Sequence, residues 1–177
     1  MGSLFLLFVW LKLVVKSLCS VEEKIIDLLE EKFAEPEFAD CFWLDVTMHP
    51  NNRLEVSIDC DTGVTFAKCR LISRYLEAII DEAGWLGEKY TLEVASPGTE
   101  KPLKQPRQYP KHLGRILEVK MTDGTTLEGR MTTVTEEHLV LEYQVVRKEG
   151  KKKITEELSS TILYPDIAEA TVKLSFK

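Results

Sequence analysis

Apolar residues in the first third of the chain change from helical to strand-like spacing. They recur at helical spacing over residues 21–33, behind a capping box that Ser20 and Glu23 can form, and this helix is expected to end before Pro36. Apolar and polar positions then alternate in two short runs, which a proline and two asparagines separate. This pattern predicts a β-hairpin. Its strands are expected over residues 42–48 and 54–58.

A second helix and a third strand follow. Thr65 can cap a helix that runs to the glycine at position 84. Alternation over residues 90–95 predicts a strand, which the following Ser-Pro-Gly sequence ends because proline cannot donate to a sheet ladder and glycine tolerates a positive φ. The order helix, strand, strand, helix, strand predicts a small α+β domain over residues 19–98, with both helices on one face of a three-stranded sheet.

The second half shows shorter strand patterns separated by turn signals. Asp123-Gly124 is a strong two-residue hairpin signal, and Gly129 inside the next run indicates a bend or bulge. Residues 159–163 are expected to form a single helical turn. Five short strands of this kind predict a small β-barrel of the Sm or SH3 class over residues 107–177. The strands are expected over residues 115–121, 127–131, 139–143, 154–158 and 167–176.

Two segments fall outside these patterns. The proline-rich residues 99–106 are interpreted as a hinge that stiffens the exit from the first domain. Residues 1–18 include an apolar run from Leu4 to Leu11, but a spanning helix needs about 20 apolar residues, and Lys12 interrupts the apolar sequence after this run. The expected explanation is a mis-assigned translation start, with the native protein beginning near residues 14–18, and the alternative is a targeting or membrane segment.

The net charge of −6 is unevenly distributed. Residues 1–99 carry 9 Lys and Arg against 17 Asp and Glu, a net charge of −8, whereas residues 100–177 carry 14 against 12, a net charge of +2. An acidic chain is a poor non-specific ligand for nucleic acid, because phosphate neutralisation needs clustered cations. The chain could still dock on a ribonucleoprotein through a protein partner or a local basic surface.

Two local clusters of cations are the candidate binding residues. One lies just after the hinge and the other at the tip of the last hairpin. Each is interpreted either as a contact for RNA phosphate or an acidic partner, or as a solvated linker and a device for solubility. The first cluster comprises Lys101, Lys104, Arg107, Lys111 and Arg115, and the second comprises Arg147, Lys148, Lys151, Lys152 and Lys153.

Sequence motifs of enzymes and metal sites are absent from the chain. It contains no phosphate-binding loop, dinucleotide fingerprint, zinc-protease motif or nucleophile elbow, so no catalysis, cofactor or small-molecule substrate is expected. Its four cysteines have no C-x-x-C spacing and its histidines are scattered, which argues against zinc and against a disulfide scaffold. The thiols are interpreted as reduced and partly buried. The cysteines are Cys19, Cys41, Cys60 and Cys69.

Residues 87–103 resemble the signature of a known family. They read Gly-Glu-Lys-Tyr-Thr-Leu-Glu-Val-Ala-Ser-Pro-Gly-Thr-Glu-Lys-Pro-Leu, which is similar to the Tyr-x-Leu-Glu-Val-Ser-Ser-Pro-Gly and Leu-Asp-Arg-Pro-Leu strings of the bacterial ribosome maturation factor RimP family. Ala95, Thr99, Glu100 and Lys101 depart from the pattern, and Lys101 lacks the bidentate fork of the arginine it replaces. The resemblance covers about residues 20–176. The motif positions interpreted as an orienting hinge are Glu93, Ser96, Pro97, Gly98, Pro102 and Leu103.

The resemblance implies the two-domain fold described above, an α+β domain followed by an Sm/SH3-like barrel. It implies a non-enzymatic cytoplasmic factor that binds the free 30S ribosomal subunit and assists its maturation, with ribosomal protein S12 and 16S rRNA as partners and no membrane. A stand-alone Sm-like RNA-binding module is the second hypothesis. A membrane-tethered protein that uses residues 4–15 is the third.

Overall fold

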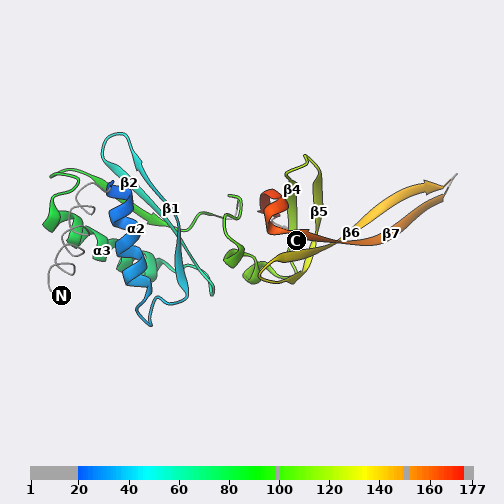
Figure 1. The fold of residues 1–177 in the computed structure, drawn as a ribbon, viewed down its shortest axis with the longest axis horizontal. Coiled ribbons are helices and arrows are strands. Elements are labelled where there is room, and N and C mark those ends of the chain that lie inside the picture. The colour runs from blue at the N-terminus through cyan, green and yellow to red at the C-terminus, as the bar shows by residue number, and fades with distance from the viewer. Residues whose placement is uncertain (1–19, 99, 150–151, 174–177) are drawn as a thin grey trace, which may run out of the picture. The chain divides into compact units, whose positions relative to one another are not determined.

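The computed structural model describes residues 20–98, 100–149 and 152–173. The chain divides into two compact units, Met1–Ser96 and Pro97–Lys177, and each is described separately. The boundary between them falls inside the family-like motif, after Ser96. The first unit contains the predicted order of helices and strands, and the second contains the five predicted strands (Figure 1).

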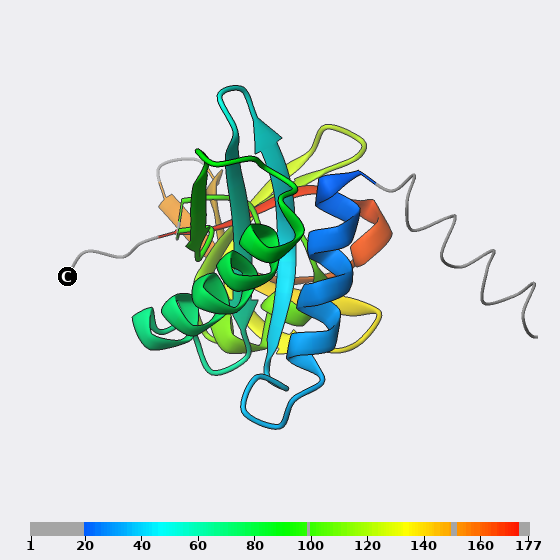
Figure 2. The ribbon, with the colours of Figure 1, turned by 90° about the vertical axis from the view of Figure 1, so that its left-hand side faces the viewer.

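The first unit is a three-stranded sheet with two helices on one face. Strands β1 and β2 are antiparallel, β2 and β3 are parallel, and β2 lies in the middle. Figure 2 shows both helices crossing the same side of this sheet. The α+β architecture predicted from the sequence is therefore confirmed. Its elements are α2 (Val21–Phe33), β1 (Cys41–His49), β2 (Arg53–Cys60), α3 (Phe66–Ala83) and β3 (Thr91–Ala95).

The ends of the two helices use the predicted caps. The Glu23 amide donates to Ser20 Oγ (3.2 Å), and the Ser20 amide donates to the Glu23 carboxylate (2.9 Å), so the capping box satisfies two amides that the first helical turn leaves without partners. Thr65 Oγ1 accepts from the Lys68 amide (3.2 Å) at the start of α3. Gly84 ends α3 with φ +65°, a conformation that glycine adopts without steric cost.

The core of the first unit lies between the helices and one face of the sheet. Alternate residues of β2 from Leu54 to Cys60 are fully buried there, and the intervening positions from Arg53 to Asp59 belong to the face that the helices do not cover. The helices contribute residues spaced three or four apart, as an amphipathic helix requires. These are Ile25 and Leu29 of α2 and Ile72, Leu76 and Ile80 of α3.

The second unit is a five-stranded antiparallel sheet. The strand order is β7-β6-β5-β4-β8, and within the described residues β7 and β8 remain the two outer strands, so pairing does not close the sheet into a ring. Residues 159–163 continue β7, and the predicted helical turn there is wrong. The 3₁₀ turn instead occupies Tyr164–Asp166. The strands are β4 (Ile116–Met121), β5 (Thr126–Val134), β6 (His138–Glu149), β7 (Lys152–Leu163) and β8 (Ile167–Val172).

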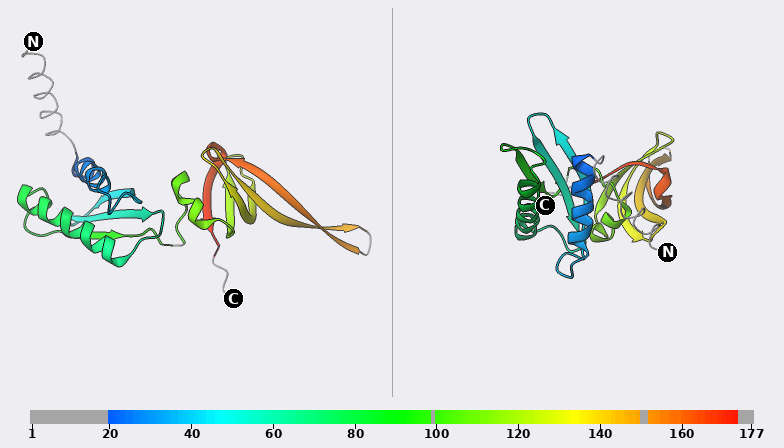
Figure 3. Two further views of the ribbon diagram at one scale, coloured as in Figure 1. Left: turned by 90° about the horizontal axis from the view of Figure 1, so that it is seen from below. Right: turned by 60° about the vertical axis from the view of Figure 1, so that its left-hand side comes forward.

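Strands β6 and β7 are longer than predicted and continue past the rest of their sheet as a two-stranded ribbon (Figures 1 and 3). Pairing of β5 with β6 reaches Glu142, whereas pairing of β6 with β7 runs on to Glu149. Gly129 lies where β5 approaches β6 most closely, because a Cβ there would be 2.7 Å from the Glu142 carbonyl oxygen. The bulge expected near Gly129 occurs between Met131 and Thr133.

Candidate functional site

The backbone of the cationic segment (residues 101–115) is tied to the sheet of the second unit at both ends. The Leu103 amide donates a hydrogen bond to the Ala170 carbonyl of β8 (2.7 Å). The Gly114 amide donates to the Met131 carbonyl of β5 (2.7 Å). The Leu103 side chain also packs against the core of this unit. This part of the predicted hinge therefore belongs structurally to the second unit.

Two short 3₁₀ turns, η1 (Pro106–Gln108) and η2 (Pro110–His112), shape the middle of the cationic segment. The first turn starts at Pro106, and the second ends two residues before Gly114. The buried Gln108 side chain holds η1 in place, because its Oε1 accepts from the amides of Lys104 (2.7 Å) and Gln105 (3.1 Å).

Tyr109 fixes the junction of the two turns in the core of the second unit. Its side chain is 3% exposed, and its ring lies 5.2 Å from the ring of Tyr164 at a tilt of 52°. Burial raises the pKa of Tyr109 to about 12, so its hydroxyl stays protonated at neutral pH. The cations of this segment are therefore carried on an anchored backbone. Lys101, Lys104, Arg107 and Arg115 are exposed, and Lys111 is half-buried.

The second predicted cluster is at the far end of the β6–β7 ribbon. Lys148 pairs in register with Lys153, and Glu149 pairs with Lys152. Arg147 is the next position of β6, and Lys151 lies outside the described residues. The ribbon therefore separates these backbone positions from the core of the sheet. That both clusters bind a partner stays a prediction.

Carboxylates lie on the sheet face of the first unit that the helices do not cover. Asp45, Glu55 and Glu93 occupy this acidic face, on β1, β2 and β3 respectively. Arg53 Nη2 lies 2.9 Å from Glu55 Oε2 and 3.4 Å from Glu93 Oε2, and His49 Nε2 lies 3.0 Å from Glu55 Oε2. Glu93, a residue of the family-like motif, is thus part of a charged network rather than an isolated side chain.

The strand of the family-like motif also forms one wall of a groove of about 700 Å³. The opposite wall is the first half of α3, which contributes Arg70 and Arg74. Motif residues Glu93 and Ser96 line it, whereas Pro97 and Gly98 begin the second unit. Gly98 has φ +82°, the positive value that the Ser-Pro-Gly turn was expected to need.

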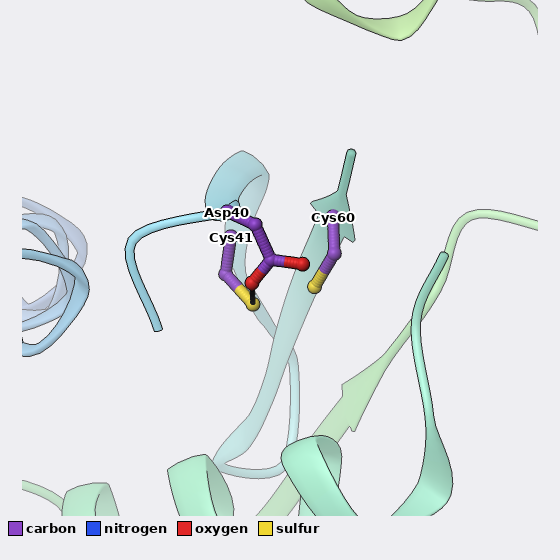
Figure 4. Close-up of side chains that lie close together, drawn as sticks. All are labelled: Asp40, Cys41 and Cys60. Carbon is purple, nitrogen blue, oxygen red and sulfur yellow. Dashed lines mark hydrogen bonds between the residues drawn. The ribbon is translucent and has the colours of Figure 1, made fainter. Parts of the chain in front are cut away.

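The structure brings together three side chains that the sequence analysis did not group. Asp40, Cys41 and Cys60 meet where β1 begins and β2 ends (Figure 4). The Lys68 ammonium lies 2.5 Å from Asp40 Oδ1, and the Thr62 hydroxyl donates to Asp40 Oδ2 (2.6 Å). These two hydrogen bonds lower the pKa of Asp40 to about 2, and the bond from Lys68 has the larger effect. We refer to Asp40, Thr62 and Lys68 as the Asp40 brace.

The pairing of the two cysteines depends on an irregularity in the hairpin. The regular register near the turn, from Asp45–Ser57 to His49–Arg53, would place Cys41 opposite Asp61, and the register shift between Trp43 and Asp45 brings Cys41 opposite Cys60 instead. Both asparagines of the three-residue loop between His49 and Arg53 have positive φ, a conformation that asparagine adopts more readily than most residues. Separately, within the described residues no helix combines the length and apolar content that crossing a bilayer requires.

Fold and charge together define a two-unit α+β protein that carries an acidic sheet face on one unit and anchored cations on the other. A sequence model of the RimP N-terminal domain matches residues 29–100. A ribosome maturation factor RimP from Christiangramia forsetii is 32% identical over 158 residues, which cover 88% of this chain and 99% of the relative. Its namesake from Flavobacterium psychrophilum is 34% identical over 157 residues, covering 88% and 98%.

A third RimP, from Porphyromonas gingivalis, is 35% identical over 150 residues, which cover 84% of this chain and 95% of the relative. These alignments span both units of the fold. The chain therefore belongs to the RimP family of ribosome maturation factors, and the family predicted from the motif at residues 87–103 is confirmed.

Proposed function

We propose that this protein assists maturation of the small (30S) ribosomal subunit in the cytoplasm, as a non-enzymatic factor that binds the free subunit. The observation that carries the proposal is the similarity to ribosome maturation factors along both units, not along one domain alone. A stand-alone RNA-binding module would need only the second unit. Membership of the family through both units therefore favours the assembly factor.

The acidic face of the first unit is the proposed contact for a basic ribosomal protein, with S12 as the expected partner. Ribosomal proteins are mostly basic, and complementary charge raises the rate of encounter and fixes the register of a protein interface. Asp45 and Glu93 are exposed on this face. Glu93→Gln should weaken binding to isolated S12 several-fold, whereas Glu22→Gln on α2 should leave it unchanged. Equal affinities for all three proteins would remove the acidic face from this contact.

The cationic segment is the proposed contact for 16S rRNA phosphate. Its backbone is held by the hydrogen bonds of Leu103, Gln108 and Gly114, so less ordering entropy is lost when its side chains bind than on a free linker. The tip at residues 147–153 is a second proposed phosphate contact. Each phosphate contact releases condensed counterions, so both contacts predict affinity that falls with salt.

The first experiment tests the proposed function as a whole. A lysate is sedimented on a sucrose gradient, and the protein is followed by antibody. Migration with free small subunits, and not with 70S particles, is the expected result. Sedimentation with membranes, or recovery as free protein bound to RNA without ribosomal subunits, would refute it in favour of the tether or the stand-alone module.

The second experiment tests the phosphate contacts with purified small subunits. Changing Lys104, Arg107 and Arg115 to glutamine should weaken binding and reduce the slope of log affinity against log salt by about one per lost contact. Lys120→Gln is the matched control, because Lys120 is an exposed lysine of the same unit that lies on β4, outside the cationic segment. An unchanged slope in the triple variant would exclude the cationic segment. The same comparison after neutralising residues 151–153 tests the tip.

A further inference from the structure

Two thiols face each other at the open end of the β1–β2 hairpin. Cys41 is the first residue of β1 and Cys60 the last of β2, and they are partners in register. Their sulfur atoms and a carboxylate oxygen of Asp40 all lie within 4.8 Å of one another (Figure 4). Cys41 is 2% exposed and Cys60 is fully buried. The sequence alone indicated reduced, partly buried thiols, and the fold places these two side by side.

The backbone pattern makes this register position suitable for a disulfide. The Asp61 amide donates a hydrogen bond to the Asp40 carbonyl (2.9 Å). Asp40 and Asp61 are therefore the hydrogen-bonded pair immediately outside Cys41 and Cys60. Because such pairs alternate along an antiparallel ladder, Cys41 and Cys60 form a non-hydrogen-bonded pair. The Cα atoms of such a pair are about 4.5 Å apart, which lies within the span of about 4.4–6.8 Å that disulfides bridge.

The electrostatic surroundings keep both thiols protonated in the closed hairpin. Burial raises the pKa of both cysteines above that of an ordinary thiol, although the Lys68 ammonium opposes the shift. Buried protonated thiols react slowly with oxidants. Oxidation therefore requires the end of the hairpin to separate briefly. The Asp40 brace and the Asp61 amide are the contacts that such an opening breaks.

The same surroundings disfavour a metal ion. Asp40 Oδ1 already accepts hydrogen bonds from the Lys68 ammonium and the Cys41 thiol (3.5 Å), and Oδ2 accepts one from the Thr62 hydroxyl. A divalent cation would have to displace the ammonium and two thiol protons, and its binding would release those protons. A covalent bond between the sulfurs needs no such displacement.

We propose that Cys41 and Cys60 are a site of reversible disulfide formation, with hydrogen peroxide as the oxidant. In the opened hairpin one thiolate attacks peroxide, which gives a sulfenic acid at that sulfur and one water. When the hairpin closes, the second thiol attacks the sulfenic sulfur, the S–S bond forms, and a second water leaves. Two thiols and one peroxide thus become one disulfide and two waters. Two electrons pass from the sulfurs to peroxide, and a small-molecule dithiol restores both thiols.

The bond would fix the open end of the hairpin that carries Glu55 of the acidic face. It would also close a loop of about 20 residues, and cross-links of that size lower the entropy of the unfolded chain. Oxidation should therefore raise the Tm of the first unit by about 5 °C or more. This inference does not depend on the proposed ribosomal function.

The test uses the full chain, first reduced and then exposed to hydrogen peroxide. Trypsin cleaves after Lys32, Arg53 and Lys68, which leaves Cys41 in peptide 33–53, Cys60 in peptide 54–68 and Cys69 in a separate dipeptide. The expected product is peptide 33–53 linked to peptide 54–68, about 2 Da lighter than the two reduced peptides together, with the link lost after a dithiol reductant.

Cys69→Ser should retain the linked peptides, and Cys41→Ser should lose them. The mapping of the unchanged protein remains decisive if Cys41→Ser fails to fold. Three results would overturn the proposal. They are a link between Cys60 and Cys69, irreversible gains of about 32 or 48 Da on separate peptides, and free thiols at both positions once the half-buried Met48 and Met121 are oxidised.

Discussion

The ion pair of the Asp40 brace links the start of β1 to α3, and its removal should destabilise the first unit in a pH-dependent way. Asp40 has a pKa of about 2 against an ordinary value of 3.8. That difference corresponds to about 2.4 kcal/mol of stability at neutral pH. The carboxylate is 25% exposed, and screening by solvent reduces the expected contribution to about 1–2 kcal/mol. Lys68 is the largest cause of the shift and the Thr62 hydrogen bond is another, so Lys68→Met should cost at most about that amount at pH 7.

The direction of the pH dependence follows from the depressed pKa. A carboxylate whose pKa is lower in the folded state contributes its full stability above the unfolded pKa and loses it as pH falls through the folded pKa. The cost of Lys68→Met should thus be constant from pH 7 to about pH 5, fall to about half by pH 3, and approach zero near pH 2. Asp40→Asn combined with Lys68→Met should cost little more than either change alone, because one interaction is lost once.

Urea unfolding followed by tryptophan fluorescence measures the free energy of unfolding of the first unit, where these substitutions lie. The chain has three tryptophans, and Trp43 and Trp85 pack against the core of the first unit. Arg74→Gln is the matched control, since Arg74 is 79% exposed in its pair with Glu77 and should contribute less than about 0.5 kcal/mol. A cost of Lys68→Met that stays the same between pH 7 and pH 3, or that adds to the cost of Asp40→Asn, would refute the assignment.

Three further predictions concern stability and are checked by urea unfolding at pH 7. Ser20→Ala should cost about 1 kcal/mol, since the capping box loses its acceptor, and Ser20→Asp should recover most of it. Gly129→Ala should cost at least about 2 kcal/mol in the second unit, because its Cβ would be 2.7 Å from the Glu142 carbonyl; no loss would contradict the observed register. Gln108→Ala should cost about 1–3 kcal/mol and increase amide exchange at Lys104, because two backbone amides lose their acceptor.

The first unit could be predicted closely because local signals and burial agree there. The alternation that marks β2 is the same alternation that buries Leu54, Val56 and Ile58, and the capping residues Ser20 and Thr65 stand where the helices begin. Each signal is a consequence of local geometry. Successive side chains of a strand point to opposite faces of the sheet, and the first amides of a helix have no partner within the helix. No long-range information was needed to place these elements.

The second unit departs from prediction where pairing, and not local propensity, decides the structure. Residues 159–161 are Ser-Ser-Thr, which gives no alternating apolar pattern. Ser160 nevertheless pairs with Leu141, and the pairing of β6 with β7 continues without a break on both sides of it. The hydroxyl contact between Tyr143 and Ser160 (3.0 Å) adds to that pairing. The sequence pattern cannot show this, because a register is a relation between two segments.

The candidate site was predictable in composition but not in arrangement. The sequence reveals that Lys104 and Arg107 are close in the chain. It does not reveal that the buried Gln108 side chain turns back and accepts hydrogen bonds from the backbone amides of Lys104 and Gln105. The Cys41–Cys60 pair illustrates the same limit. It forms only through the register shift between Trp43 and Asp45, which the local pattern of residues does not show.

The separation of charge between the units bears on how a maturation factor selects its target. Phosphate contacts alone bind any RNA, and the net charge of −8 in residues 1–99 opposes such binding through long-range repulsion. With the two contacts proposed above, a surface that presents phosphate and a basic protein together would engage both units, whereas naked RNA would engage only the second and be repelled by the first. Selectivity then arises from the penalty on the wrong partner as much as from contacts with the right one.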